Sequence, residues 1–330
     1  MGPPRGRAAA QRERLGDLPR SPRRRHRLPD PHHPGVRDAP PREPLRPGDD
    51  VHGRRPGPRR DRRARRVKVL WVLAHPEPRS LNGALKDAGV AALERAGHEV
   101  VVSDLHAMAW NPVVTAADYG HDPDERFRVG PVSARAHAAG TLSADVRAEQ
   151  AEVAAADTLV VQFPLWWYGM PAILKGWFDR VFLKGFAYGV TDPDHPGRTL
   201  RYGEGPLAGK RALVVTTVGG RGPDLGPRGV HGHLDELLFP LQHGTLFYVG
   251  YEVLPPVVVT GANRVSDDEF ATAAKELCAR LLAVPHTTPL PFRRQNGGDY
   301  DDDLVLRDHL APGRTGLGIH LRERPTETDR

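Results

Sequence analysis

Hydrophobic and polar positions follow a repeating order from residue 67 onward, in which short apolar runs alternate with longer segments of helical spacing. The apolar runs span residues 67–73, 99–105, 158–163, 210–217 and the pair 252–254 and 257–259, which Pro255 and Pro256 interrupt. Continuous β-branched and apolar runs of this length are typical of strands buried on both faces. The segments of helical spacing are 81–96, 143–156, 171–183, part of 229–247, and 267–282.

Strands that alternate with helices in this way predict a parallel sheet with helices on both faces, a doubly wound α/β fold of five strands. In this architecture, ligands bind beyond the carboxyl ends of the strands, where the strand order switches. The loops of interest therefore follow the first, third and fourth strands. We assign residues 67–285 to this domain, with a long loop of little periodicity over 106–142, and residues 286–330 to an irregular C-terminal arm.

Residues 1–66 differ from the rest of the chain in charge and composition. They hold 20 Arg, no Lys, 8 acidic residues and 13 Pro, a net charge of +12, whereas the remainder has 27 basic and 33 acidic residues and carries −6. The segment has almost no clusters of aliphatic residues, so it cannot bury enough apolar surface to offset the entropy lost on ordering. We therefore interpret it as a disordered extension. The alternative is an arm whose arginines attract the phosphates of a nucleic acid or a membrane surface. A transit peptide is not favoured, because the segment has a single Ser and several acidic residues. The acidic body gives no indication of nucleic-acid binding.

Several classes of function are excluded by what the chain lacks. A single cysteine, Cys278, excludes an internal disulfide framework and a cysteine-rich metal site, so we expect no metal. No apolar run is long enough to span a membrane and no apolar signal segment is present, so we expect a cytoplasmic protein without membrane insertion. The dinucleotide-binding G-x-G-x-x-G and the P-loop motif are both absent.

The loop after the first strand, residues 74–82, leads into a helix that Ser80 is placed to cap. Free backbone N–H groups and the dipole at such a helix start favour an anion, and His75 and Arg79 add side-chain donors. On the evidence of this loop alone, an ordinary capped helix start is the better explanation.

The loops after the third and fourth strands carry stronger signals. Trp166, Trp167 and Tyr168 are adjacent at the end of a buried strand. Because loops are usually polar, this aromatic loop indicates a planar ligand such as a flavin ring, with a hydrophobic interface as the alternative. The glycine-rich loop 217–223 lets a ligand approach the backbone, and His231 lies downstream as a candidate catalytic group.

Sequence blocks in and around these loops match a known family. They are Leu73-Ala74-His75 with Ser80 and Asn82, Ser103-Asp104-Leu105, Leu142-Ser143 with Ala148-Glu149-Gln150, and the long block from Gln162 to Phe182 with Phe186-Ala187-Tyr188 after it. Over residues 67–321 the chain resembles the NAD(P)H:quinone oxidoreductase (DT-diaphorase) family. The resemblance implies a flavodoxin-like fold and an NAD(P)H dehydrogenase (quinone) that passes two electrons to a quinone by ping-pong hydride transfer.

The resemblance also implies a cofactor, a partner and roles for single residues. The cofactor would be FAD, with FMN as the alternative, and NAD(P)H would be the electron donor. The residues that would hold or line the cofactor are His75, Ser80, Leu81, Asn82, Gln150, Pro164, Leu165, Trp166, Trp167, Tyr168, Gly169, Thr217, Val218, Gly219 and Gly220. Tyr188 would close the substrate pocket, and His231 would act beside the flavin. Family members with a C-terminal arm are homodimers, so we expect a homodimer with active sites at its interface and a quinone or related small molecule as acceptor.

Two positions depart from the family pattern. Six residues before His231 the family often has tyrosine, where this chain has Leu225, so we expect His231 to act without a tyrosine partner. Two residues after Tyr188, a second family tyrosine is replaced by Val190, which indicates a wider or more apolar pocket. An azo- or nitro-reductase of the same fold, and a flavin-binding regulatory subunit of a potassium-efflux system, are the alternative functions.

Overall fold

A computed structural model describes residues 66–322 of the chain. The extension predicted over residues 1–66 lies outside the described residues apart from Arg66, and its interpretation stays a prediction. The strands are β1 (Lys68–Leu73), β2 (Glu99–Asp104), β3 (Thr158–Pro164), β4 (Arg211–Thr217), β5 (Glu252–Val253) and β6 (Val257–Val259). The α-helices are α1 (Leu81–Arg95), α2 (Val129–Ala139), α3 (Ala144–Ala155), α4 (Ala172–Val181), α5 (Leu234–Leu241) and α6 (Asp267–Ala283).

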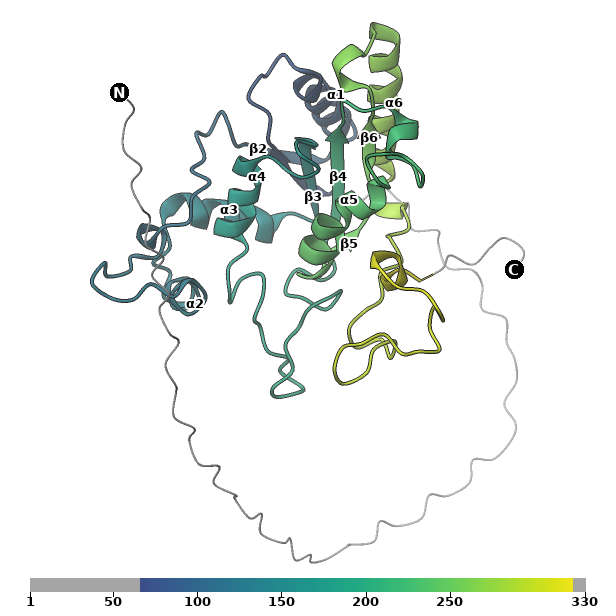
Figure 1. Cartoon of the computed structure of the whole chain (residues 1–330). Helices are drawn as coiled ribbons and strands as arrows, with labels where there is room; N and C mark the ends of the chain where they lie inside the picture. The colour runs from purple at the N-terminus through teal and green to yellow at the C-terminus, as the bar shows by residue number, and fades with distance from the viewer. Residues whose placement is uncertain (1–65, 323–330) are drawn as a thin grey trace, which may run out of the picture. The chain divides into compact units, whose positions relative to one another are not determined.

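The strands form one parallel sheet in the order β2-β1-β3-β4-β5, with β6 also paired to β4. Both short strands therefore lie along the same neighbour, and Pro255 and Pro256 separate them as the sequence predicts. The chain starts in β1, moves outward to β2 and returns across β1 to β3, which places the switch in strand order between β1 and β3. This arrangement confirms the doubly wound α/β fold (Figure 1).

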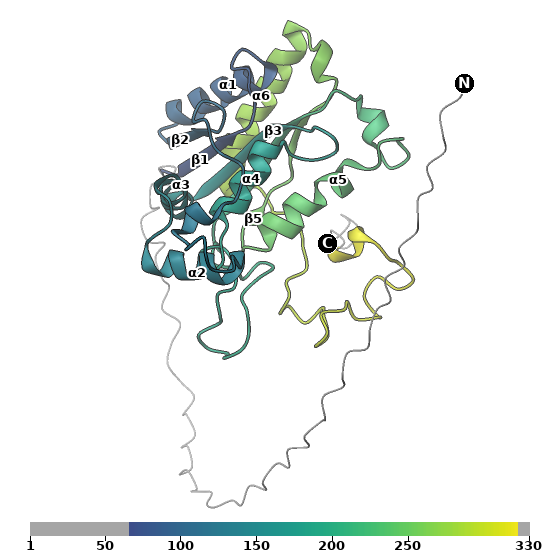
Figure 2. The same ribbon diagram turned by 60° about the vertical axis from the view of Figure 1, so that its left-hand side comes forward.

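Helices cover both faces of the sheet, and the side-chain alternation of β1 shows why (Figures 1 and 2). Val69, Trp71 and Leu73 pack with buried residues of α1 and α6, whereas Leu70 and Val72 pack with those of α3, α4 and α5. Successive strand residues point to opposite faces, so a continuous apolar run supplies two cores at once. The half-buried Cys278 of α6 contacts the Ala88 carbonyl of α1, at 3.5 Å from its sulfur, which agrees with a packing role.

The segment 106–142 is more ordered than its sequence suggests, and the prediction of an unstructured loop is wrong there. It contains a 3₁₀ turn, Ala116–Tyr119, and the eleven-residue helix α2. Helix α2 buries only Val132, Ser133 and Ala136, so its apolar stripe is too narrow to stand out in the sequence. The segment is held by the buried Arg180 of α4, whose Nη2 lies 2.7 Å from Asp118 Oδ1 and whose guanidinium stacks on Trp110.

Beyond α6, the described part of the chain follows an irregular path that returns to the body. Phe292 is buried in the core beside α5, and its backbone pairs with Leu321 through an isolated bridge. Both views show this arm, drawn in yellow, next to α5 (Figures 1 and 2). Its separation from the domain at residue 286 stays a prediction.

Candidate functional site

The loop between β1 and α1 presents an open helix start. Ser80 caps α1 by accepting a hydrogen bond from the Gly83 N–H at 3.2 Å, and Gly83 is required because a Cβ there would lie 1.8 Å from the Pro78 carbonyl oxygen. Leu81 and Asn82 supply the first-turn N–H groups that no helical carbonyl can reach. These donors and the positive end of the helix dipole favour a negatively charged ligand.

A buried hydrogen-bond network fixes this loop to three strands. The Asn82 amide donates to Thr217 Oγ1 at 2.9 Å, and the Gln162 amide donates to the Asn82 carbonyl at 2.8 Å. The Trp71 indole N–H donates to Gln162 Oε1 at 2.9 Å. Because the side chains of Asn82 and Thr217 are used in this network, they form the floor of the site and leave the backbone to face a ligand.

The loop after β3 makes a tight turn with two aromatic residues at its tip. Trp166 and Gly169 exchange two backbone hydrogen bonds, and the residues between them, Trp167 and Tyr168, have φ of 49° and 60°. Both central residues of such a primed turn need positive φ, which glycine or asparagine adopts easily. A bulky L-residue there costs about 1–2 kcal/mol. Strain of this kind persists where the surrounding structure imposes it, which is frequent at binding sites.

The tip of this turn is also unusually exposed. The exposed fractions are 47% for Trp166, 96% for Trp167 and 51% for Tyr168. Three adjacent aromatics in contact with solvent mark a surface that another molecule covers. The His75 ring lies 6.3 Å from that of Trp166, so the turn stands directly beside the helix start.

The loop after β4 contains Gly219 and Gly220, which present backbone without side chains and are named the glycine wall. Val218 is buried and donates its N–H to the Val259 carbonyl, and Gly219 and Gly220 follow at the surface. A Cβ on Gly219 would lie 2.9 Å from the Asn263 amide, and a Cβ on Gly220 would lie 3.6 Å from the His231 ring. Glycine therefore leaves open the space between this loop and its neighbours, and the role of the loop in facing a ligand stays a prediction.

His231 has a tyrosine partner, contrary to what Leu225 led us to expect. The Tyr168 hydroxyl lies 2.9 Å from His231 Nδ1, with the ring centroids 5.9 Å apart. Leu225 is buried in the 3₁₀ turn Gly222–Leu225 and offers only an apolar methyl near Gly220. The sequence did not reveal this pair because its members lie 63 positions apart on different loops.

These loops enclose a cavity of about 560 Å³. Its lining includes ten of the residues predicted from the sequence: His75, Ser80, Leu81, Asn82, Pro164, Leu165, Trp166, Trp167, Thr217 and Gly219. Ala262 and Asn263, from the loop after β6, also line it and were not predicted. Only the position of that loop at the carboxyl end of the sheet could have suggested them.

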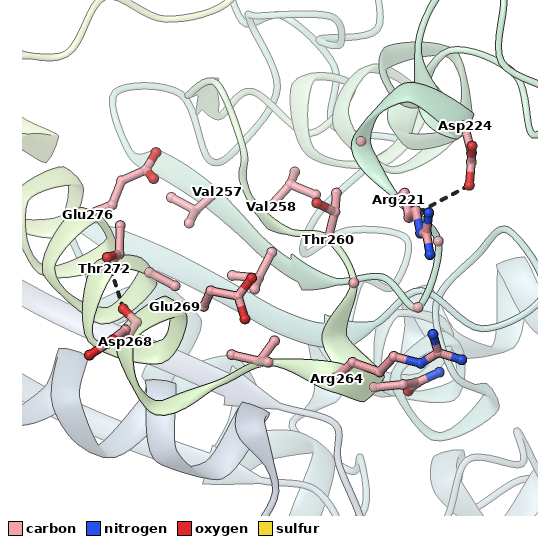
Figure 3. A pocket seen from close by; sticks show the side chains of 18 residues that line it. Arg221, Asp224, Val257, Val258, Thr260, Arg264, Asp268, Glu269, Thr272 and Glu276 are labelled. Atoms are coloured by element: carbon pink, nitrogen blue, oxygen red, sulfur yellow. Dashed lines mark hydrogen bonds between the residues drawn. The ribbon is translucent and has the colours of Figure 1, made fainter.

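A second, larger cavity of about 900 Å³ shares Gly219 and Asn263 with the first (Figure 3). Its walls come from the glycine-rich loop, β6 and the start of α6. Arg221 and Arg264 are on one side, and the carboxylates of Asp268, Glu269 and Glu276 are on the α6 side. The two cavities therefore adjoin at Gly219 and Asn263, and together they are named the groove.

Two predicted site residues lie elsewhere. Gln150 is buried on α3, where its amide donates to the Val181 carbonyl at 2.9 Å, so the structure does not bring it to the cavity. Tyr188 lines a separate cavity of about 430 Å³ with Met170, Phe178 and Tyr248 among its walls. Burial raises the pKa of the Tyr188 phenol, which keeps it protonated at neutral pH.

Residues 66–322 offer neither a metal centre nor a membrane-spanning helix. No group of three or more His, Cys, Asp or Glu side chains is placed to hold a metal ion in this range. None of the helices described there combines the length and apolar character needed to cross a membrane.

The fold defines a flavodoxin-like protein, and the groove is a candidate ligand site at the switch in strand order. The family model of the flavodoxin-like fold matches residues 67–281. By these similarities and those that follow, the chain belongs to the NAD(P)H:quinone oxidoreductase family.

Relatives from fungi, mammals and bacteria support this assignment. A ribosyldihydronicotinamide dehydrogenase-like protein of Penicillium crustosum is 43% identical over 266 residues, 80% of this chain and 98% of the relative. NAD(P)H dehydrogenase [quinone] 1 of Rattus norvegicus is 40% identical over 227 residues, 68% of this chain and 80% of the relative. The crystal structure of a quinone reductase from Klebsiella pneumoniae, described as putative, has a TM-score of 0.75 and 51% identity, covering 78% of this chain and all of that one.

Proposed function

We propose that this protein is a flavin-dependent NAD(P)H dehydrogenase that reduces quinones by two electrons. The observation that carries the proposal is the strained turn from Trp166 to Gly169, which presents exposed aromatic rings beside an open helix start and a glycine wall. The quinone specificity is supported by the names of the family's members, and the site supports a planar cofactor.

The residues present fit a flavin. Trp166 and Trp167 offer rings for stacking, and the uncapped N–H groups of Leu81 and Asn82 suit a phosphate. A bound flavin supplies the redox chemistry by accepting hydride from the nicotinamide and donating it to the acceptor. The protein's own part is to orient both reactants, to exclude water, and to place the His231 ring near the glycine wall.

We propose FAD rather than FMN as the bound flavin. The 560 Å³ cavity suits the isoalloxazine and its first phosphate, and the adjoining 900 Å³ cavity would hold an adenylate. Arg221 and Arg264 supply positive charge between the two parts of the groove. Denaturing the purified protein and identifying the released flavin by chromatography and mass tests this, and FMN as the sole flavin would contradict it.

We also propose that the working enzyme is a homodimer. Tyr188 and Tyr248 line a cavity separate from that of Trp167, so one chain does not gather all predicted site residues. A second copy would bring its own Tyr188 to the exposed turn and cover the three aromatics. Sedimentation of the flavin-loaded protein tests this, since a monomer at assay concentration that still reduces quinone would contradict the proposal.

The decisive experiment is a comparison of electron donors and acceptors. NADH, NADPH and dihydronicotinamide riboside would each be assayed with a quinone, an azo dye and a nitroaromatic. We expect the quinone to give the highest kcat/KM, with ping-pong kinetics because donor and acceptor use the same face in turn. A preference for the azo or nitro compound would favour a reductase of that class. Flavin binding without turnover would favour a regulatory flavoprotein.

A further inference from the structure

The hydrogen bond between Tyr168 and His231 joins the turn after β3 to the segment after the glycine-rich loop. Tyr168 is held at the tip of the strained turn, with its own φ at 60°, and its hydroxyl lies 2.9 Å from His231 Nδ1. On the other side, the His231 backbone N–H donates to the Asp224 carbonyl at 3.1 Å. Both partners are therefore positioned by backbone geometry, so that the hydroxyl and the ring nitrogen meet in a defined orientation.

The opposite edge of the His231 ring faces the glycine wall. A methyl group placed on Gly220 would lie 3.8 Å from Nε2 and 3.6 Å from Cδ2 of this ring. The same point is 3.9 Å from a methyl carbon of Leu225, which has no polar atom to offer. Nε2 is thus the polar atom that His231 directs toward Gly220, while Nδ1 is engaged by Tyr168.

We propose that Tyr168 is a positioning residue that fixes the tautomer of His231. A neutral imidazole carries one proton, so a nitrogen that accepts a hydrogen bond forces the proton onto the other nitrogen. With the Tyr168 hydroxyl donating to Nδ1, the proton sits on Nε2 and points toward Gly220. An N–H donor aimed at this wall would stabilise negative charge on a ligand lying against it. This inference rests on the proposed function, in which a bound flavin would lie against the glycine wall.

The chain contains a matched control for the test. The Tyr300 hydroxyl lies 2.9 Å from His320 Nδ1, the same contact in the C-terminal arm. Tyr168→Phe and Tyr300→Phe each remove one oxygen and keep the ring. His231→Gln assigns the His231 signals, because only that set disappears.

Nitrogen-15 spectra of histidine side chains in the flavin-loaded protein measure the tautomer directly. We expect His231 to be protonated on Nε2 in the unmodified protein. In Tyr168→Phe, the population with the proton on Nδ1 should rise about three- to tenfold, as expected for loss of one neutral hydrogen bond. Tyr300→Phe should change only the His320 signals. A wild-type His231 protonated on Nδ1, or a tautomer unchanged in Tyr168→Phe, would overturn the proposal.

The flavin midpoint potential supplies a second readout. If the Nε2–H group favours the reduced flavin, Tyr168→Phe should lower the potential by up to about 30 mV, which is tenfold for a two-electron couple. An unchanged potential with a changed tautomer would show that the N–H does not face the flavin and would also overturn the proposal. Absence of quinone turnover in the unmodified protein would instead defeat the proposed function, because the tautomer measurement is independent of turnover.

Discussion

Two tyrosine–histidine pairs in this molecule share one contact but differ in their setting. Tyr168–His231 and Tyr300–His320 both place a phenol oxygen 2.9 Å from Nδ1. Tyr168 is 51% exposed, on a strained turn at the mouth of a cavity. The arm pair is half-buried and lines a different cavity of about 430 Å³: burial raises the pKa of the Tyr300 phenol, and burial with help from Arg293 lowers the pKa of the His320 imidazole.

This comparison shows that the same hydrogen bond has different consequences in different surroundings. The arm pair lies among stacked rings, including those of Phe239 and His243, and holds the arm against α5. The site pair leaves one edge of its imidazole facing a wall without side chains. The arm pair is therefore suited to stability and the site pair to acting on a ligand. Variants in the two regions should separate these two roles.

The largest effect should come from Phe292→Ala in the arm. Phe292 is buried between the rings of His243 and Phe247, and removing it leaves a cavity. We expect the free energy of unfolding to fall by about 3–5 kcal/mol, measured by denaturant titration. Flavin content per folded molecule should stay the same, and Phe292→Leu should recover most of the stability. Loss of flavin from folded Phe292→Ala would show that the two regions are coupled.

Acid should weaken the arm through His243. Burial, and to a smaller extent the neighbouring His320, lowers the pKa of His243 to about 4. An imidazole in the unfolded chain titrates near 6.5, so the unfolded state binds the proton first. The contribution to stability is complete above pH ~6.5 and is lost as pH falls toward 4, by about 1–3 kcal/mol. Unfolding measured from pH 7 to 4 should show this slope, and His243→Phe should flatten it. The same slope in both proteins would contradict the assignment.

In the site, Trp167→Ala should affect the ligand rather than the fold. The side chain is 96% exposed in the single chain, so it contributes little to the core. Loss of one stacking aromatic should weaken flavin binding by about 1–2 kcal/mol, or five- to thirtyfold in Kd. Fluorescence titration of the flavin-free protein measures this. Full flavin affinity in this variant would mean that the turn binds something else.

The smallest effect should be seen at Trp167, where we expect the glycine variant to be more stable than the alanine variant, the reverse of the usual order. Because Trp167 has φ of 49°, Trp167→Gly should be more stable than Trp167→Ala by about 0.5–1 kcal/mol. At Phe292, which is not in a left-handed conformation, Phe292→Gly should be the less stable of the two variants. Thermal unfolding of the four proteins decides this, and alanine ahead of glycine at both positions would remove the argument for strain.

Much of the fold could be predicted from the sequence because the central strands β1, β3 and β4 are buried on both faces. Continuous apolar runs such as Lys68–Leu73 give an unambiguous signal, and even the break at Pro255 and Pro256 was predicted correctly. Helix α2 was missed because it buries three residues, two of them small. The segment before it is held by a tertiary contact, the ion pair of Arg180 with Asp118 in the 3₁₀ turn, and local patterns carry no trace of such contacts.

The site was predictable where it is made of contiguous loops and unpredictable where it depends on contacts between them. The aromatic turn and the glycine wall stand out in the sequence, and both line or border the cavity. The partner of His231 is not visible there, because any exposed tyrosine could have filled that role. Gln150 was assigned by resemblance, and the structure gives its amide a bond to Val181 instead.

The interruption of the last strand at Pro255 and Pro256 also limits edge-to-edge strand pairing with other molecules at this side of the sheet. β5 and β6 lie at one edge of the sheet, where the Leu290 N–H of the arm already donates to the Val253 carbonyl at 2.7 Å. Other N–H and C=O groups of such an edge could pair with another chain. Proline has no N–H to donate, and the two prolines divide this edge into strands of two and three residues. A partly unfolded neighbour would find no continuous edge to extend here. Restoring a continuous strand at these two positions would therefore expose the protein to aggregation before it changed any chemistry in the groove.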